Sequence, residues 1–448
     1  MAGKTMILGL GMTAGYGTLA DSWRAPHVDP GNYAKVEANV RYAQAAERGG
    51  FSFLFTPDFP AVRGDVEADG IQNVLEPMMV LAAISQATER IGFVATGSTT
   101  FQEPFNTARQ FKALDVMSHG RAGWNAVTTS DPTVAANYGR SVAGRAERYG
   151  RAHEAIQIVQ ALWGSWEQDA WLQDQAAGRF LDASKLRPVN LRGEHVASRG
   201  PLPIPPSEQG QPVIFASGGP SPHLLELAGR YASGFIAEVW TIEEARAQRD
   251  LVRDAAAQAG RDPDDVKYFP GLMTTVAPTT REGLDRRLAL GGDVVDARLP
   301  HLGALLGLRI DPSRYDEPLT AEQLAAARAS PGDPRSGIAL RVAREGWSPR
   351  DALAHGVIDY HPTTVGPAAV HADHLQDWLE AGAADGFWIL PDVYEDGVDA
   401  FVDEVVPELR RRGIYPEEYA GATLRENLGV PHQYGIDARI ALGATARS

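Results

Sequence analysis

The chain has 448 residues, of which 44% are hydrophobic and 22% are charged, a composition typical of a folded globular protein. Its formal net charge of −15 opposes binding to nucleic-acid phosphates and to anionic lipid headgroups, so we expect neither nucleic acid nor membrane as a partner. The sequence contains no cysteine, which excludes disulfides, iron–sulfur clusters, thiolate metal sites and a cysteine nucleophile.

Apolar runs are short throughout the sequence. The first 15 residues hold only one brief apolar run, and no later stretch reaches the roughly 18 uninterrupted apolar residues of a spanning helix. We therefore expect a soluble, cytoplasmic protein.

Short β-type runs alternate with segments of helical spacing, which predicts an α/β fold built from βα units. Prolines at Pro77 and Pro104 mark helix starts, and Gly49-Gly50 marks a helix end. Eight units favour a single (β/α)8 TIM barrel that spans residues 1–448. The eight predicted strands are Met6–Leu10, Phe51–Phe55, Ile91–Ala95, Ala122–Val127, Val213–Ala216, Phe235–Glu238, Val266–Phe269 and Phe387–Leu390.

Two long segments interrupt this alternation, at about 165–211 and about 291–362. A compact domain rarely tolerates such long connections without a role. We interpret both as insertions over the carboxyl-terminal face of the barrel, where they form lids or walls around the site; disordered decoration is the alternative.

Polar and small residues follow the second, third, fourth and fifth predicted strands. The carboxyl-terminal strand ends of a parallel barrel carry the active site, so these residues are the candidates for chemistry. They are Thr56 to Asp58, Thr96 to Thr100, Thr128 to Ser130, and Ser217 to Ser221.

The turn from Ser217 to Ser221 has a feature that suits a phosphate. Ser221 is a plausible helix cap and Pro222 a first helical residue, so free backbone N–H groups and the positive helix end would converge on one point. Tyr149 could donate its hydroxyl to the same anion. An ordinary capped turn remains the alternative interpretation.

Histidines and large aromatic residues supply further candidates. His361 precedes the last βα unit and is an acid–base candidate because histidine titrates near neutrality. Trp23, Phe59 and Trp388 could form pocket walls, although core packing is the more common role of such residues. His371 and His374 could touch a metal, but without a third ligand we interpret them as part of a solvated helix face and expect no metal site.

A dinucleotide-binding domain is a competing interpretation of the N-terminus. Gly9, Gly11 and Ala14 match the G-x-G-x-x-A pattern after a strand. The helix that this motif requires is interrupted by Pro26 and Pro30, so we reject the interpretation.

Several longer blocks carry a resemblance to a known family. They are Ala45–Gly49 with Phe55 and Asp58, Ile91–Asn106, Ala108–Thr129 (with GRAGWNAVTT), Glu147–Tyr149, Asp385–Phe387, and the tail from Val405 through Gly413 to Leu428-Gly429. At these residues the chain resembles the bacterial-luciferase superfamily of FMN-dependent monooxygenases, in the branch of nitrilotriacetate, EDTA, dibenzothiophene-sulfone and long-chain-alkane monooxygenases, with riboflavin lyase as a further relative. The likeness spans nearly the whole chain.

The resemblance implies a luciferase-like barrel that holds FMN at its carboxyl-terminal mouth. Asp58, Thr96 and Asn125 would line the flavin ring, with Asp58, Asn125 and His361 as the catalytic candidates. Tyr149, Ser217 and Ser221 would hold the FMN phosphate. This chain departs from its relatives at Arg145-Ala146, near where many members have histidine, and at Ser217–Gly219, where Gln-Ala-Gly is usual.

The resemblance also implies a two-component system. Reduced FMN and O2 would oxidise or cleave a small organic substrate, such as a nitrogen heterocycle, a riboflavin-like molecule or an organosulfur compound. A separate NAD(P)H:flavin reductase would supply the reduced FMN, and the chain would form a homodimer or homotetramer. Two alternatives are a non-catalytic flavin-binding or storage protein with the same barrel, and a barrel that uses deazaflavin for hydride transfer.

Overall fold

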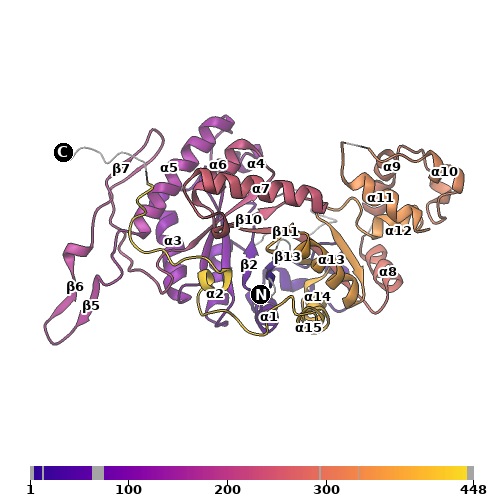
Figure 1. The fold of residues 1–448 in the computed structure, drawn as a ribbon. Coiled ribbons are helices and arrows are strands. Elements are labelled where there is room, and N and C mark those ends of the chain that lie inside the picture. Colours follow the sequence, from indigo (N-terminus) through magenta and orange to yellow (C-terminus); the bar gives the residue numbers. More distant parts are fainter. Residues whose placement is uncertain (1–4, 13–14, 63–74, 292–293, 331, 441–448) are drawn as a thin grey trace.

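Eight parallel strands close into a barrel in the computed structural model, which describes residues 5–12, 15–62, 75–291, 294–330 and 332–440 (Figure 1). Each strand pairs with its neighbour, and the last strand pairs with the first. All eight sequence predictions overlap these strands, which confirms the (β/α)8 fold. The barrel strands are β1 (Ile7–Gly11), β2 (Phe53–Thr56), β3 (Gly92–Ser98), β4 (Ala122–Val127), β9 (Val213–Gly218), β10 (Gly234–Ala237), β11 (Lys267–Val276) and β13 (Gly386–Pro391).

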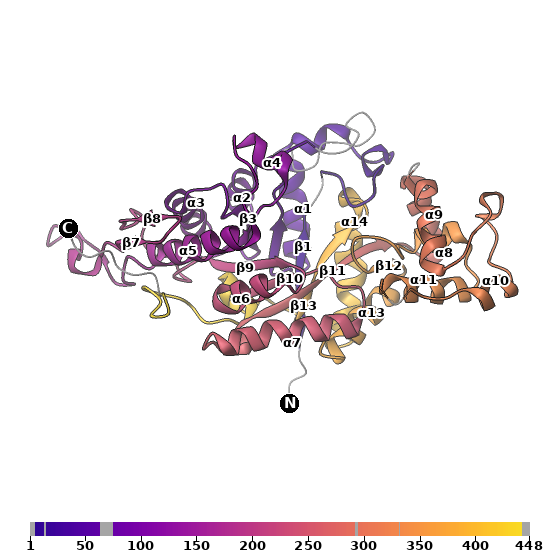
Figure 2. The same cartoon turned by 90° about the horizontal axis from the view of Figure 1, so that it is seen from above.

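Helices cover the outside of the barrel, several of them beginning at a proline as the sequence predicts (Figures 1 and 2). Among the described residues, none of the helices is long and apolar enough to cross a lipid bilayer. The covering helices are α1 (Val36–Arg48), α2 (Pro77–Ser85), α3 (Pro104–Met117), α5 (Arg145–Trp163), α6 (Pro222–Tyr231), α7 (Ile242–Gln258), α13 (Ala368–Glu380), α14 (Tyr394–Ala400) and α15 (Val406–Arg411), with a π-helical turn (Phe401–Val405) joining the last two.

Aromatic side chains fill the interior of the barrel. The Phe53 ring lies 5.4 Å from the Phe215 ring and 5.1 Å from the Phe269 ring, between centroids, and all three residues are fully buried. Side chains alternate in direction along a strand, so two residues further on, Phe55 and Ser217 also face inward. The barrel therefore has an apolar layer beneath a partly polar layer at the carboxyl-terminal strand ends.

Two glycines of β1 make room for this aromatic layer. A Cβ atom at Gly9 would lie 2.3 Å from the Phe53 ring, and one at Gly11 would lie 2.5 Å from Leu390. The glycines of the rejected G-x-G-x-x-A pattern thus serve packing inside the barrel. Ala14, the third member of that pattern, lies outside the described residues.

The C-terminal tail closes the amino-terminal end of the barrel with a short helix, α16 (Leu424–Leu428). Leu424 and Leu428 are buried in the same cluster as Phe53 and Phe215. The Leu424 amide donates to the Gly120 carbonyl, just before β4, at 3.0 Å. The tail block that supports the family resemblance therefore closes the amino-terminal end of the barrel. The opposite, carboxyl-terminal end is not covered by this tail.

The segment at about 165–211 does not lie over the carboxyl-terminal face, where we expected it. It forms two hairpins, which project from the side of the molecule that carries α3 and α5 (Figures 1 and 2). Gln209, near its end, donates to the Ala122 carbonyl at the start of β4. The physical reason is that this segment connects a helix to a strand, so both its ends lie at the amino-terminal end of the barrel. Between them, the β7–β8 hairpin reaches along the outside of α5, where Arg151 donates to the His195 carbonyl at 3.4 Å. The hairpin strands are β5 (Trp171–Asp174), β6 (Arg179–Leu181), β7 (Leu191–Arg192) and β8 (Ala197–Ser198).

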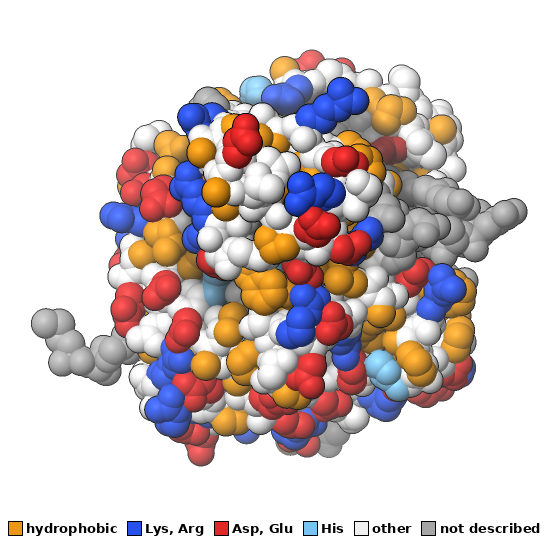
Figure 3. Space-filling view, turned by 90° about the vertical axis from the view of Figure 1, so that its right-hand side faces the viewer, with side chains coloured by type: hydrophobic (Ala, Val, Ile, Leu, Met, Phe, Trp, Pro, Cys, Tyr) orange, Lys and Arg blue, Asp and Glu red, His pale blue; other side chains and the backbone are white. Residues whose placement is uncertain are grey.

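The segment at about 291–362 is a largely helical excursion with its own apolar cluster, and it lies at one side of the barrel (Figures 1 and 2). It follows the extended end of β11, which also pairs with an additional strand, β12 (Thr363–Gly366). Figure 3 looks onto this side of the molecule, where acidic and basic side chains are interspersed. Helix α8 (Thr280–Leu290) precedes the segment, whose own helices are α9 (Val294–Leu306), α10 (Ala321–Ala326), α11 (Arg335–Arg344) and α12 (Pro349–Ala354). Elsewhere in the chain, a short helix, α4 (Pro132–Asn137), follows β4.

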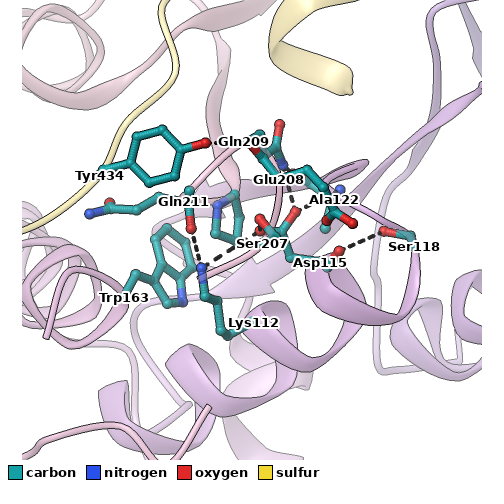
Figure 4. A network of polar contacts seen from close by, with 12 residues as sticks. Lys112, Asp115, Ser118, Ala122, Trp163, Ser207, Glu208, Gln209, Gln211 and Tyr434 are labelled. Atoms are coloured by element: carbon teal, nitrogen blue, oxygen red, sulfur yellow. Dashed lines mark hydrogen bonds and ion pairs between the residues drawn. The ribbon is translucent and has the colours of Figure 1, made fainter. Parts of the chain in front are cut away.

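A buried polar network fixes the segment 165–211 to the barrel (Figure 4). Lys112 and Asp115 of α3 have no solvent-exposed side-chain surface, and their charged atoms lie 3.8 Å apart. Lys112 donates to the Gly210 carbonyl, while Asp115 accepts hydrogen bonds from Ser207 at 2.5 Å and Gln209 at 2.6 Å. Burial lowers the pKa of Lys112 to about 8, and the negative charge of Asp115 opposes this decrease and so favours the charged form of Lys112.

We predict that Asp115→Asn destabilises the protein by about 3 kcal/mol, because it keeps the side-chain size but leaves Lys112 buried without a counter-ion. Urea-induced unfolding at pH 7 measures this loss. Adding Lys112→Met to Asp115→Asn should recover most of the free energy of unfolding. Equal stability of Asp115→Asn and the wild type would contradict the importance of this pair.

Candidate active site

A cavity of about 870 Å³ opens at the carboxyl-terminal ends of the barrel strands. Its walls come from the ends of β2, β3, β4, β9, β10 and β13, together with the end of the 291–362 segment. Active sites of (β/α)8 barrels lie at this end. The polar and aromatic residues of the lining include Asp58, Phe59, Thr96, Asn125, Thr128, Thr129, Ser130, Asp131, Ser217, Glu238, Tyr360, His361 and Trp388.

Asn125 and Thr96 form a paired polar group in the cavity wall. They lie opposite each other in the β3–β4 register, and the Asn125 amide nitrogen donates to the Thr96 hydroxyl at 2.9 Å. Asn125 is 2% exposed, and its side-chain oxygen has no hydrogen-bond partner among the described residues. A buried acceptor without a donor is unfavourable, so this oxygen favours a ligand that brings an N–H or O–H group.

Asp58 lies in the cavity wall just after β2 and is partly buried. Burial, with a smaller contribution from the negative charge of Glu76, raises the pKa of the Asp58 carboxyl to about 6. Its charge therefore changes within the range in which enzymes work.

His361 lies in the cavity wall, but its environment corrects one expectation. It is 1% exposed, and its ring packs edge-on against Trp388 with centroids 5.0 Å apart. Burial lowers the pKa of His361 to about 3, so the side chain does not titrate near neutrality as we expected from its residue type. Neither ring nitrogen has a partner among the described residues, which leaves a neutral imidazole able to hydrogen-bond to a ligand.

The three residues expected at a phosphate are not all in the cavity lining. Ser217 lies in the wall, whereas Ser221 caps α6 and accepts from the Leu224 amide at 3.4 Å. Tyr149 of α5 stacks on His223 in the first turn of α6, with centroids 5.2 Å apart. Tyr149 and Ser221 thus both lie at the amino-terminal end of α6, which follows directly from the cavity wall at Ser217.

The turn between Ser217 and Ser221 keeps its backbone accessible. Gly218 has φ of +129°, a conformation that side-chain-bearing residues rarely adopt, and a Cβ at Gly219 would meet nothing within 4 Å. An anion can therefore approach the backbone at the positive end of α6.

Two of the three predicted aromatic walls belong to the cavity. Phe59 and Trp388 line it, whereas Trp23 does not. Glu238 and Tyr360 are absent from the predicted site residues, yet their side chains also line the cavity and are hydrogen-bonded to each other. Glu238 directly follows β10, so the rule that selects residues at strand ends could have found it.

His371 and His374 do not lie on a solvated helix face, which corrects that expectation. His371 is fully buried and hydrogen-bonds to Thr364 at 2.6 Å and to the Gly366 carbonyl at 3.0 Å. His374 stacks on Trp378 and lines a second cavity, of about 700 Å³, between the outer helices and the 291–362 segment. Within the described ranges no cluster of three His, Cys, Asp or Glu side chains could hold a metal ion. Because none of the residues that line the second cavity belongs to a barrel strand, we place the chemistry in the barrel mouth.

Comparison with known proteins gives matches along nearly the whole chain. The family described as luciferase-like monooxygenase matches residues 12–385. N-acetyl-S-(2-succino)cysteine monooxygenase of Bacillus subtilis is 34% identical over 96% of this chain and 98% of its own length. Nitrilotriacetate monooxygenase component A of Aminobacter aminovorans is 36% identical over 91% of this chain and 93% of its own.

Solved structures show the same architecture. EDTA monooxygenase from Chelativorans sp. BNC1 superposes with a TM-score of 0.81 at 30% identity, covering 97% of this chain and all of that one. Riboflavin lyase, solved with modified FMN and the substrate riboflavin, superposes with a TM-score of 0.75 at 28% identity and covers 95% of this chain and 96% of its own. The similarity thus includes both the barrel and its long connections.

We predict that Asp58→Asn raises the melting temperature more at pH 8 than at pH 4.5. The folded pKa of about 6 exceeds the unfolded value of 3.8, so protonation stabilises the fold fully only below pH 3.8, and this stabilisation is lost as pH rises from there through 6. Asparagine cannot ionise and avoids the loss. Thermal unfolding of the ligand-free protein at both pH values measures the difference.

Asp254→Asn, which replaces an exposed aspartate on α7, is the matched control for that experiment. It should shift the melting temperature equally at the two pH values. If Asp58→Asn and Asp254→Asn changed the melting temperature identically at both pH values, the pKa of Asp58 would not be raised in the folded protein.

Proposed function

Since the chain belongs to the luciferase-like monooxygenase family, we propose that it is the oxygenating component of a two-component flavin monooxygenase. It would use reduced FMN and O2 to oxidise or cleave a small organic substrate. The observation that carries the proposal is the cavity at the strand ends, which brings Asn125, a buried acceptor unpaired among the described residues, together with the turn from Ser217 to the start of a helix at Ser221.

The residues present fit FMN. A planar nitrogen heterocycle offers N–H donors, and the Asn125 side-chain oxygen lacks one among the described residues. The amino-terminal end of α6, with Ser217, Ser221 and Tyr149, suits the phosphate. Riboflavin lyase, which was solved with modified FMN, supports a flavin in a barrel of this shape.

Each candidate residue has a role in the proposal. Reduced FMN, when bound, supplies the electrons that activate O2 for transfer of one oxygen atom to the substrate. Thr96 accepts from the Asn125 amide nitrogen and fixes its orientation, so the Asn125 oxygen would accept a hydrogen bond from a bound flavin ring. Asp58 would lie beside the ring, where its carboxyl, with its raised pKa, would hold or release a proton, while His361 provides a neutral hydrogen-bonding group beside Trp388. Phe59 and Trp388 exclude water from the reacting groups.

A separate NAD(P)H:flavin reductase completes the proposed system. The relative from Aminobacter aminovorans is named component A, which supports an oxygenase that works with a second protein. The glycines that could have suggested a dinucleotide site are packed against Phe53 and Leu390. We propose a homodimer or homotetramer for the assembly. Nitrogen heterocycles, riboflavin-like molecules and organosulfur compounds are the proposed substrate candidates.

The decisive experiment measures oxygen transfer. FMN kept reduced by an added NADH:flavin reductase, with ¹⁸O₂ and a panel of nitrogen heterocycles and organosulfur compounds that includes riboflavin, should give substrate-dependent O2 uptake and a product with one ¹⁸O atom. Reactions without the protein control for oxidation by peroxide that free reduced FMN releases. Tight FMN binding with no turnover of any substrate would favour the binding or storage protein instead.

The phosphate site is tested by comparing FMN with riboflavin, which lacks the phosphate. Ser221→Ala should weaken FMN binding about tenfold, the effect of losing one hydrogen bond to a charged group, and leave riboflavin binding nearly unchanged. Quenching of flavin fluorescence measures both dissociation constants. Tyr149→Phe should act in the same direction.

Thr279→Ala is the matched control, because Thr279 caps α8 in the same way as Ser221 caps α6. It removes a helix cap away from the proposed phosphate site and should leave the FMN affinity unchanged. If Ser221→Ala weakened the binding of FMN and of riboflavin equally, the phosphate would not bind at this position.

A further inference from the structure

The charges that line the mouth cavity have one sign. Asp58, Asp131 and Glu238 lie in its wall, and no lysine or arginine occurs among the lining residues in the described part of the chain. Asp131 is already engaged, because it caps α4 by accepting from the Thr133 and Val134 amides. The other two carboxylates have no ion-pair partner among the described residues, so both are available to a ligand.

Glu238 is the carboxylate best placed to meet a substrate. It lies at the end of β10 and accepts a hydrogen bond from the Tyr360 hydroxyl through one of its two oxygens. Tyr360 belongs to the end of the 291–362 segment, and the residue is 59% exposed at the cavity. Tyr360 therefore holds Glu238 in position while leaving the second carboxylate oxygen as an acceptor.

The arginines near the mouth cavity share one acidic partner outside its lining, Asp359. Arg287 and Arg298 line a small adjoining cavity that shares Thr18, Met273 and Tyr360 with the mouth. Both form ion pairs with the buried Asp359, Arg298 at 3.1 Å. Neither arginine lines the mouth cavity itself, and Asp359 offsets part of their positive charge.

The remaining lining adds aromatic and neutral polar groups. His361 is 1% exposed, and its neutral imidazole offers one donor and one acceptor nitrogen, neither paired among the described residues. Trp388, Phe59 and Tyr360 offer aromatic surfaces that attract cations and pack against planar groups. Carboxylates and aromatic faces together are complementary to an organic nitrogen base.

We infer that this cavity accepts an organic nitrogen base, an amine or a basic nitrogen heterocycle with an aromatic or apolar body, and discriminates against carboxylate substrates through Glu238. The inference rests on the proposed function of the same site. It separates this chain from the relatives named for nitrilotriacetate and for N-acetyl-S-(2-succino)cysteine, compounds that carry several carboxylates.

Binding of three matched probes tests the inference. 1-Naphthylmethylamine, 1-naphthalenemethanol and 1-naphthoate share one ring system and differ in charge. Isothermal titration calorimetry at pH 7.5, on the full chain with and without FMN, should give the tightest binding for the amine and at least about tenfold weaker binding for naphthoate. Naphthoate binding as tightly as the amine, or no binding by any probe, would overturn the inference.

Two variants test whether the negative charge of Glu238 causes the preference for the amine over naphthoate. Glu238→Gln keeps the side-chain size and should reduce the preference for the amine over naphthoate about fivefold or more. Tyr360→Phe keeps the carboxylate, removes only its hydrogen-bond donor, and should retain most of the preference. An unchanged preference in Glu238→Gln, with a melting temperature like that of the wild type, would refute the role of Glu238.

The same titrations separate this inference from the proposed function. FMN affinity is measured independently of the probes, so a protein that selects the amine but fails to bind FMN would refute the flavin function alone. A protein that binds FMN but prefers naphthoate would refute the substrate class alone.

Discussion

Eight strands close into a barrel only if their inward side chains fill the space that closure creates. In this chain Phe53, Phe215 and Phe269 fill it, and the glycines of β1 provide the room that these rings require. Because side chains alternate with a period of two along each strand, this aromatic layer also determines which residues form the layer above it. The residues two positions further on face the same space one layer higher, where the apolar core gives way to polar residues such as Ser217.

The two ends of the barrel differ because different segments of the chain cover them. At the amino-terminal end, Leu424 and Leu428 of the C-terminal tail complete the apolar core, and the network around Lys112 and Asp115 anchors the neighbouring connection. At the carboxyl-terminal end, the connections carry polar side chains and leave a cavity of about 870 Å³. The apolar residues of the tail and the Lys112–Asp115 network thus lie at one end, and the cavity with the unpaired Asn125 and His361 groups lies at the other, as expected when a fold separates its structural face from its reactive face.

A few residues set the charge of the cavity and its surroundings. Arg287 and Arg298 beside it are paired with Asp359, while Asp58 and Glu238 lack cationic partners among the described residues. Under the proposed function, a barrel shared by oxygenases of different substrates would keep the layer proposed to bind flavin and change its specificity through a few charges at the rim. The end of the 291–362 segment contributes to that rim.

The barrel and most of its reactive layer could be predicted from local patterns in the chain. The residues after each predicted strand included Asp58, Thr96 and Ser217, because alternation and strand direction are local properties of a sequence, whereas Asn125, within the fourth strand, came only from the family resemblance. Connection order could also have placed the segment at about 165–211, since a link from a helix to a strand returns to the amino-terminal end.

Burial, by contrast, depends on tertiary packing. The low pKa of His361, the buried positions of His371 and His374, and the pairing of Arg287 with Asp359 arise where segments distant in the sequence come together. The hydrogen bond between Tyr360 and Glu238 has the same origin, because it joins the end of the 291–362 segment to the end of β10. No local pattern encodes these contacts, so the charge and protonation of the cavity wall followed only from the folded arrangement.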